Sequence, residues 1–218
     1  MTLQGKHAFV TGGSRGIGRT IAARLAANGA RVTVLGRNAA ALQAVVAAGE
    51  AHFASAADVG DPAALAGAVA DAISHNGPVD ILVANAGVAP AAPFLKTSAD
   101  TFRETIAVNL LGVTEAARAV LGGMVERKAG RIIAIASTAG LKGYPYVSPY
   151  VASKHAVIGF VRALALETAK TGVTVNAVCP GFTETDIVVE SIERIVARPA
   201  ARVRRRLPSS SSTTPSNA

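Results

Sequence analysis

Cysteine is almost absent from this chain of 218 residues, which contains only Cys179. A single cysteine excludes an internal disulfide framework. The four histidines show no spacing that would assemble a metal site, so we expect neither disulfides nor structural zinc. We expect Cys179 to be a small buried residue rather than a nucleophile, because the sequence offers it no partner base.

The sequence also lacks an apolar run of the roughly 18 to 20 residues that a membrane-spanning helix requires. Its N-terminus, MTLQGKHAFV, does not have the pattern of a cleavable signal. We therefore expect a cytoplasmic protein with no membrane partner. Half of the residues are apolar, which is enough to bury one sizeable core.

Acidic residues are outnumbered by lysine and arginine, 14 to 22, and the net charge is +8. The excess is concentrated in residues 198–218, RPAARVRRRLPSSSSTTPSNA, which contain five arginines and no acid. Residues 1–197 keep 17 basic and 14 acidic residues, a charge of only +3. Because this basic segment has no aromatic companions, we expect no nucleic-acid partner.

Short β-branched segments alternate with longer segments rich in alanine and leucine from Lys6 onward. This alternation predicts an α/β domain in which helices cover both faces of a parallel sheet. The expected strands are 7–11, 31–35, 52–56, 80–85, 131–137 and 173–178. The expected helices are 16–28, 39–48, 62–75, 99–127 and 149–171. We expect residues 1–197 to form this single domain.

The loop FVTGGSRGIGRT, between the first expected strand and helix, carries Gly12, Gly16 and Gly18. Glycines let the backbone approach a pyrophosphate closely, and the free N–H groups and positive dipole end of the helix stabilise its charge. Three glycines also occur in ordinary tight turns. The strand before the loop and the helix after it favour a nucleotide-phosphate loop.

The stretch YVASK places Tyr150 and Lys154 four residues apart, on one face of a helix. A tyrosine phenol has a pKa of about 10 in water, and a nearby ammonium group lowers it. This spacing is common by chance between surface residues. Ser137, at the end of the expected strand GRIIAIAS, makes the pattern more specific, because ligand-binding residues gather at the carboxyl edge of a parallel sheet.

Together these segments resemble the short-chain dehydrogenase/reductase family. The resemblance rests on TGGSRGIG, DV, ANAG, AVNLLG, YVASK and CPGFTET, and it covers about residues 5–190. It implies a Rossmann-type doubly wound sheet. The segment 130–186 is most similar to ketoreductases that act on β-ketoacyl thioesters and polyketides, whereas neighbouring branches of the family reduce simple ketones or sugars.

The resemblance implies a catalytic tetrad of Asn109, Ser137, Tyr150 and Lys154. Tyr150 would exchange a proton with the substrate oxygen, and general acid–base catalysis of this kind contributes about 10²- to 10⁴-fold in rate. Ser137 would hydrogen-bond the same oxygen. Lys154 would hold the nicotinamide ribose and lower the pKa of the tyrosine, and Asn109 would anchor a water molecule in a proton relay.

The end of the second expected strand bears on the choice of nicotinamide nucleotide. NAD-binding proteins commonly place a carboxylate there, whereas NADP-binding proteins offer an arginine to the 2′-phosphate. In VTVLGRN, Gly36 stands at this position and Arg37 follows, and the resemblance adds Arg15 as a second cation near the phosphate. Both arginines could be solvated surface charges, but two guanidinium groups would pair with the phosphate. We therefore expect NADP(H), with NAD(H) as the alternative.

The remaining cofactor contacts are implied by the family motifs. Asp58 would contact the adenine ring, the ANAG segment would lie under the cofactor, and the PGFTET segment would meet the nicotinamide carboxamide. The expected cofactor set is Gly12, Ser14, Arg15, Gly16, Ile17, Gly18, Arg37, Asp58, Val59, Asn85, Ala86, Gly87, Tyr150, Lys154, Pro180, Gly181, Thr183 and Thr185.

The family pattern stops near Ala197. Residues 186–197 are expected to begin a helix over the substrate, and residues 198–218 to form a disordered tail without the family's last strand. A basic arm, an ordinary disordered tail and a frameshift near Ala197 in a GC-rich gene all remain open interpretations. Without that strand, 173–178 would be an exposed sheet edge.

The function expected from the sequence is interconversion of a ketone and a secondary alcohol by an NADP(H)-dependent oxidoreductase. The alternative is a catalytically impaired remnant that binds the nucleotide. The family's usual interfaces suggest a homodimer through 99–127 and 149–171, whereas we do not expect the common tetramer.

Overall fold

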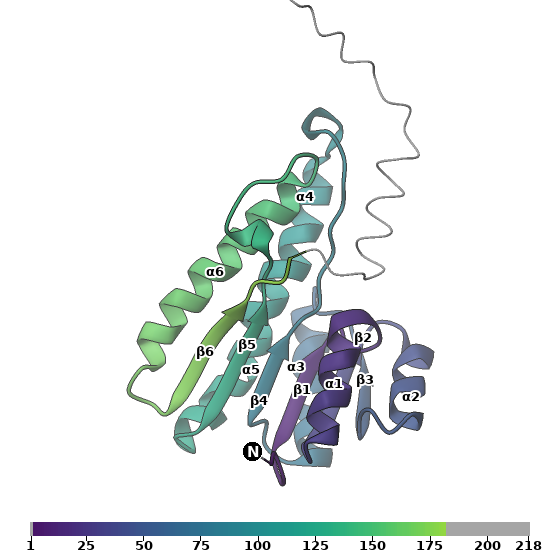
Figure 1. The fold of residues 1–218 in the computed structure, drawn as a ribbon, viewed down its shortest axis with the longest axis vertical. Helices are drawn as coiled ribbons and strands as arrows, with labels where there is room; N and C mark the ends of the chain where they lie inside the picture. The colour runs from purple at the N-terminus through teal and green to yellow at the C-terminus, as the bar shows by residue number, and fades with distance from the viewer. Residues whose placement is uncertain (1, 182–218) are drawn as a thin grey trace, which may run out of the picture.

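The computed structural model describes residues 2–181 (Figure 1). Six parallel strands form one sheet in the order β3-β2-β1-β4-β5-β6. The strands are β1 (His7–Thr11), β2 (Arg31–Gly36), β3 (Phe53–Ala56), β4 (Ile81–Ala84), β5 (Gly130–Ile135) and β6 (Val173–Val178). Every predicted strand is present, with ends that differ by at most two residues, and the predicted doubly wound fold is confirmed.

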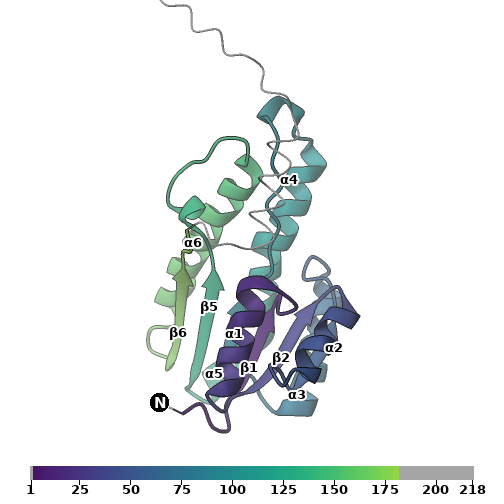
Figure 2. The ribbon, with the colours of Figure 1, turned by 45° about the vertical axis from the view of Figure 1, so that its right-hand side comes forward.

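Helices cover both faces of the sheet, as Figures 1 and 2 show. On one face, α1 and α2 bury Ala22, Leu42 and Val45 against β1 and β2. The opposite face is covered by α3, α5 and α6, whose buried side chains form one core with Phe9, Leu82 and Ile132 of the central strands. The helices are α1 (Gly16–Ala27), α2 (Ala39–Ala47), α3 (Pro62–Asn76), α4 (Ala99–Ile106), α5 (Gly112–Glu126) and α6 (Ser148–Thr168).

The single helix predicted over 99–127 is wrong in one respect. A π-helical turn, Ala107–Leu111, lies between α4 and α5. Such a turn inserts an extra residue into the helical spacing and is frequent at functional sites. It carries Asn109, which is fully buried. Because a π turn depends on tertiary contacts rather than on apolar periodicity, the sequence pattern does not show it.

The continuous helical segment Ala99–Glu126 is long and apolar enough to cross a membrane by length and composition alone, although no membrane-spanning run was predicted. Core helices of soluble proteins pass the same test, and one such helix is weak evidence. In the structure α5 packs against α3, β4 and β5 and buries Val113, Val120 and Met124 beneath it. This packing accounts for part of the apolar composition, since 33% of the most apolar 18-residue window is buried.

All six strands run in the same direction, so their carboxyl ends lie at one edge of the sheet. The strand order reverses between β1 and β4. From β1 the chain continues through β2 to β3 on one side of the sheet, and from β4 it continues through β5 to β6 on the other side. In open α/β sheets, ligands bind outside the carboxyl ends of the strands at this switch point. The expected helix at 186–197, the tail at 198–218 and the question of a seventh strand lie outside the described residues.

Candidate active site

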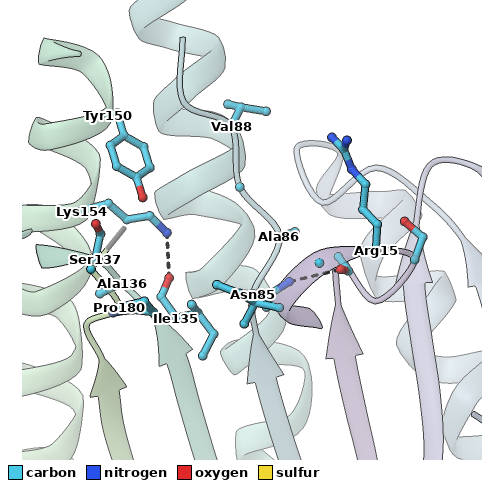
Figure 3. A pocket seen from close by; sticks show the side chains of 16 residues that line it. Arg15, Asn85, Ala86, Val88, Ile135, Ala136, Ser137, Tyr150, Lys154 and Pro180 are labelled. Atoms are coloured by element: carbon cyan, nitrogen blue, oxygen red, sulfur yellow. Dashed lines mark hydrogen bonds between the residues drawn. The ribbon is translucent and has the colours of Figure 1, made fainter. Parts of the chain in front are cut away.

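A pocket opens at this carboxyl edge, where the segments after β1, β4, β5 and β6 converge on the first turn of α6 (Figure 3). Predicted site residues make up most of its lining: Gly12, Ser14, Arg15, Gly16, Ile17, Asn85, Ala86, Gly87, Ser137, Tyr150, Lys154, Pro180 and Gly181. The prediction missed Val88, Ile135 and Ala136, which also line the pocket. These three carry aliphatic side chains, so their residue types gave no signal of a site.

The loop after β1 has the shape that a phosphate cradle requires. Gly12 has φ +65°, and a Cβ there would lie 2.8 Å from Asn85 Nδ2, so only glycine fits. A Cβ on Gly18 would overlap Gly12 O, so this glycine allows α1 to pack closely on the loop, behind the pocket lining. Both positions therefore need the glycines that the sequence provides.

The N-terminus of α1 is chemically suited to an anion. Its N-cap, Arg15, makes no side-chain cap hydrogen bond, and the first turn contains no acid. By contrast, Asn38, Asp61 and Ser98 cap α2, α3 and α4 with their side chains. The N–H groups and positive dipole end of α1 thus face the pocket with no acidic residue in the first turn of this helix, and the loop fits a nucleotide pyrophosphate.

Beside this loop, the segment after β4 is fixed by β1. Thr11 Oγ1 accepts hydrogen bonds from the N–H groups of Asn85 and Ala86 at 2.9 and 3.0 Å. In return Asn85 Nδ2 donates to Thr11 O and Gly12 O, at 3.1 and 3.2 Å. The floor of the pocket is therefore rigid across the switch point.

Lys154 enters the pocket from α6 and is only 4% exposed. Its Nζ donates a hydrogen bond of 2.7 Å to Ile135 O, at the carboxyl end of β5 (Figure 3). Burial lowers the pKa of Lys154 to about 8. A Cβ built on Gly87 would lie 3.7 Å from this Nζ, which places the ammonium group directly against the segment after β4.

Tyr150 lies one helical turn before Lys154, whose Nζ is 5.7 Å from the tyrosine ring centroid. Burial raises the pKa of the Tyr150 phenol, and a hydrogen bond with Ser137 opposes this effect only in part. The predicted lowering of this pKa by Lys154 is therefore wrong for the cofactor-free pocket, because desolvation of the phenolate is the largest influence. Ser137 and Tyr150 do lie together, as the motif predicts.

Asn109 lies behind the pocket wall rather than in its lining, and its side chain is fully buried. Its Oδ1 accepts a hydrogen bond of 2.8 Å from Val88 N, and its Nδ2 donates to Val88 O at 2.9 Å and to Ser153 Oγ at 3.0 Å. The side chain thus clamps the backbone at Val88. The relay water assigned to Asn109 stays a prediction.

The predicted adenosine residues lie apart from the main pocket. Arg37 Nη1 is 3.8 Å from Asp58 Oδ2, and both side chains are exposed. The other carboxylate oxygen, Asp58 Oδ1, accepts a hydrogen bond of 2.8 Å from Gly60 N. A Cβ on Gly36 would lie 3.7 Å from Leu42 Cδ2 and from Ser14 Oγ, which is ordinary van der Waals contact, so the backbone there does not itself require glycine. Val59 is buried against Gly112, which gives it a packing role.

The remaining expectations concern two threonines, the cysteine and metal binding. Thr183 and Thr185 lie outside the described residues. Cys179 is half-buried and packs against the core, broadly as expected. Within residues 2–181, no group of three His, Cys, Asp or Glu side chains could hold a metal ion.

Comparison with known proteins places this geometry in a family context. A family model described as short chain dehydrogenase matches residues 6–195. A protein of Streptomyces coelicolor that carries a ketoacyl reductase name is 42% identical over 190 residues, which are 84% of this chain and 73% of the relative. The 2-dehydro-3-deoxy-L-rhamnonate dehydrogenase (NAD(+)) of a Sphingomonas species is 41% identical over 185 residues, 84% of this chain and 74% of the relative.

A solved structure extends the similarity to three dimensions. A variant of actinorhodin polyketide ketoreductase with NADPH superposes with a TM-score of 0.84 at 40% sequence identity. The superposition covers 88% of this chain and 76% of that chain.

Proposed function

The chain belongs to the short-chain dehydrogenase family, and from this premise we propose that it is an NADP(H)-dependent oxidoreductase that interconverts a ketone and a secondary alcohol. One observation supports this most strongly: Ser137, Tyr150 and Lys154 line the same pocket as the glycine loop. Proton-transfer groups and a phosphate cradle thus face one continuous space.

A bound nicotinamide nucleotide would supply the hydride. Gly12, Gly16 and the N-terminus of α1 would hold its phosphates, and Lys154 would hold the ribose next to the nicotinamide. Ser137 would donate a hydrogen bond to the substrate oxygen and stabilise its developing negative charge. These groups are already positioned by β1, β5 and α6, so little reorganisation is needed.

Tyr150 would donate the proton to the substrate oxygen during reduction. Its raised pKa keeps the phenol protonated at neutral pH, which is the form that a proton donor needs. A bound ligand that brings charge next to the phenol would change this pKa, and the Nζ of Lys154 already lies 5.7 Å from the centroid of the tyrosine ring.

NADP(H) is the better-supported cofactor. Arg15 lies in the pocket lining, Arg37 directly follows β2, and Gly36 stands where an NAD-binding protein would place a carboxylate. The actinorhodin ketoreductase structure contains NADPH, whereas the name of the Sphingomonas relative specifies NAD(+). NAD(H) is accordingly the alternative cofactor.

For the substrate, we propose a β-ketoacyl thioester or a related polyketide carbonyl. The names of the Streptomyces relative and of the superposed ketoreductase support this class. The sugar-acid dehydrogenase name of the Sphingomonas relative supports a different branch. The test is to purify the chain, titrate it with NADPH and NADH by fluorescence, and follow nicotinamide absorbance with β-ketoacyl thioesters or simple ketones plus the reduced nucleotide, and with sugar acids plus the oxidised nucleotide. Fastest turnover of a β-ketoacyl thioester with NADPH is expected, whereas preference for a sugar acid would overturn the substrate assignment.

The same titration addresses the second candidate, a nucleotide-binding remnant without turnover. Tight NADPH binding with no reduction of any carbonyl would favour the remnant. The homodimer through 99–127 and 149–171 and the cytoplasmic location stay predictions.

A further inference from the structure

A buried hydroxyl lies between the tetrad asparagine and the catalytic tyrosine. Ser153 is on α6, three residues after Tyr150 and immediately before Lys154, and it is 0% exposed. Its Oγ accepts a hydrogen bond of 3.0 Å from Asn109 Nδ2 and donates one of 2.7 Å to Tyr150 O. Ser153 therefore connects the π turn to the first turns of α6.

This contact completes a chain of hydrogen bonds that starts in the pocket wall. Val88 lines the pocket, and its N–H and C=O groups both bond to the Asn109 side chain. The second N–H of Asn109 Nδ2 goes to Ser153, and the single hydroxyl proton of Ser153 goes to Tyr150 O. Each N–H or O–H group in this series of hydrogen bonds is used once. Rotation of the Asn109 or Ser153 side chain would therefore break a hydrogen bond to the neighbouring residue.

The chain joins the two sides of the pocket. Val88 belongs to the segment after β4, and Tyr150 and Lys154 belong to one turn of α6. In an α-helix, the carbonyl of residue 150 also accepts the N–H of residue 154. The Ser153 hydroxyl thus reaches the peptide group that sets the spacing of the tyrosine and the lysine.

We propose that Ser153 is a positioning residue for the reaction, an inference that rests on the proposed function and deepens it. It holds Asn109 in the orientation that clamps Val88 and fixes the turn that presents Tyr150. Asn109 and Ser153 are both 0% exposed, so bulk solvent does not reach their hydrogen bond. Loss of the hydroxyl would leave one N–H of the Asn109 side chain without its acceptor. The Asn109 side chain, and with it the Val88 backbone that it binds, could then shift.

The variant Ser153→Ala tests this with Thr168→Val as its matched control. Thr168 lies on the same helix, is 3% exposed, and donates its hydroxyl to Leu164 O at 2.8 Å. It takes no part in the hydrogen bonds that link Val88, Asn109, Ser153 and Tyr150. Both variants remove one buried hydroxyl from α6, so both should lose a similar amount of stability in urea unfolding. Only Ser153→Ala should lower kcat at saturating NADPH, by about tenfold or more, because a shift of about 1 Å in reacting groups costs up to about 10²-fold.

A double-mutant cycle with Asn109→Ala separates positioning from general destabilisation. If Ser153 acts through Asn109, Ser153→Ala should lower kcat by less than about twofold in the Asn109→Ala background. The KM for NADPH should change less than kcat in Ser153→Ala, because the phosphate loop is not part of the chain.

Three results would overturn the proposal: wild-type kcat in Ser153→Ala, an equal loss of kcat in Thr168→Val, or independent multiplication of the Asn109→Ala and Ser153→Ala effects. If Ser153→Ala does not fold, Ser153→Cys replaces it, since a thiol of similar size is a weak donor; kcat must again fall, and a wild-type value would refute the role. Failure of the proposed function looks different, because the wild-type chain would then bind NADPH in the fluorescence titration without oxidising it.

Discussion

Two buried polar networks lie at opposite edges of the same sheet. At the carboxyl edge, Val88, Asn109, Ser153 and Tyr150 are linked around the pocket that Lys154 enters. At the other edge, His7 begins β1 and is 1% exposed. Each network has a buried basic group, Lys154 beside the first and His7 within the second, and burial lowers the pKa of both because it penalises the charged form.

The His7 network is closed. His7 Nδ1 hydrogen-bonds to Gly77 O at 2.7 Å and Nε2 to Thr33 Oγ1 at 2.8 Å, while Asn76 Nδ2 donates to the same Thr33 oxygen at 3.0 Å. Gly77 O can only accept, so Nδ1 carries the proton and neutral His7 satisfies both partners. None of these residues lines the pocket.

The difference shows that burial and a shifted pKa do not by themselves mark a catalytic group. Such groups point to function only when they also reach a space that a substrate can enter. Lys154 and Tyr150 line a pocket, whereas His7 ties β1 to β2 and to the end of α3. Changes to the proton donor Tyr150 should therefore alter kinetics with little effect on stability, and changes at His7 should do the reverse.

The largest effect is expected from Tyr150→Phe, which removes the proton donor but keeps the ring. Ketone reduction should fall by about 10²- to 10⁴-fold. Steady-state assays of nicotinamide oxidation measure the loss, and the urea midpoint should stay near that of the wild type. Tyr146→Phe is the matched control, because Tyr146 is 54% exposed and is not part of the pocket lining. Equal turnover in the two variants would contradict the role of Tyr150.

A smaller effect is expected from Arg37→Ala at the adenosine end. A hydrogen-bonded charged pair is worth about 1.5–3 kcal/mol, so NADPH affinity should fall by about 10- to 100-fold while NADH affinity stays the same. Fluorescence titrations with both nucleotides measure the change. Arg103→Ala removes the same charge from an exposed ion pair with Asp100 and serves as the control. A parallel loss for NADH would show that Arg37 does not read the 2′-phosphate.

At the opposite edge, His7→Leu should lower the free energy of unfolding by about 1–3 kcal/mol, because Thr33 and Gly77 lose a buried partner. The measurements are urea unfolding and kcat, and kcat should not change. His155→Leu, at an exposed position on α6, should change stability by less than about 0.5 kcal/mol. A loss of kcat in His7→Leu with no loss of stability would erase the contrast between the two edges.

The smallest effect is a pH dependence of stability. The pKa of His7 is lowered from 6.5 in the folded state, mainly by burial, with Asp80 opposing this shift and Arg31 adding to it. The unfolded chain then binds a proton as pH falls through 6.5 while the folded chain does not, so stability is complete above 6.5 and decreases below it. Urea unfolding from pH 7.5 to about 5 should show this decrease in the wild type and a weaker one in His7→Leu. Identical slopes would assign the acid sensitivity to other groups.

Much of the carboxyl edge could be predicted from the sequence, because its motifs are local. The glycine loop needs particular backbone angles at Gly12, and the helical spacing of Tyr150 and Lys154 places them together. The π turn around Asn109 could not be predicted, because it is stabilised by bonds to Val88 and Ser153 that are distant in sequence.

The direction of the Tyr150 pKa shift and the ion pair of Arg37 with Asp58 could not be predicted from the sequence either. The direction of the Tyr150 pKa shift depends on how deeply the phenol is buried, and spacing alone suggested the opposite sign. Likewise, the approach of Arg37 to Asp58 joins the ends of β2 and β3, which meet only in the folded sheet. Pocket residues such as Ile135 contribute a backbone carbonyl, which every residue type has.

The most direct test of the proposed function is isotope transfer. NADPH deuterated at C4 of the nicotinamide, on each face in turn, is incubated with the chain and a β-ketoacyl thioester, and the product is analysed by mass spectrometry. The account predicts an alcohol that carries deuterium on the carbinol carbon from one of the two labelled forms, and almost no product from Tyr150→Phe. Recovery of unreduced thioester from a folded wild-type chain that binds NADPH would contradict it.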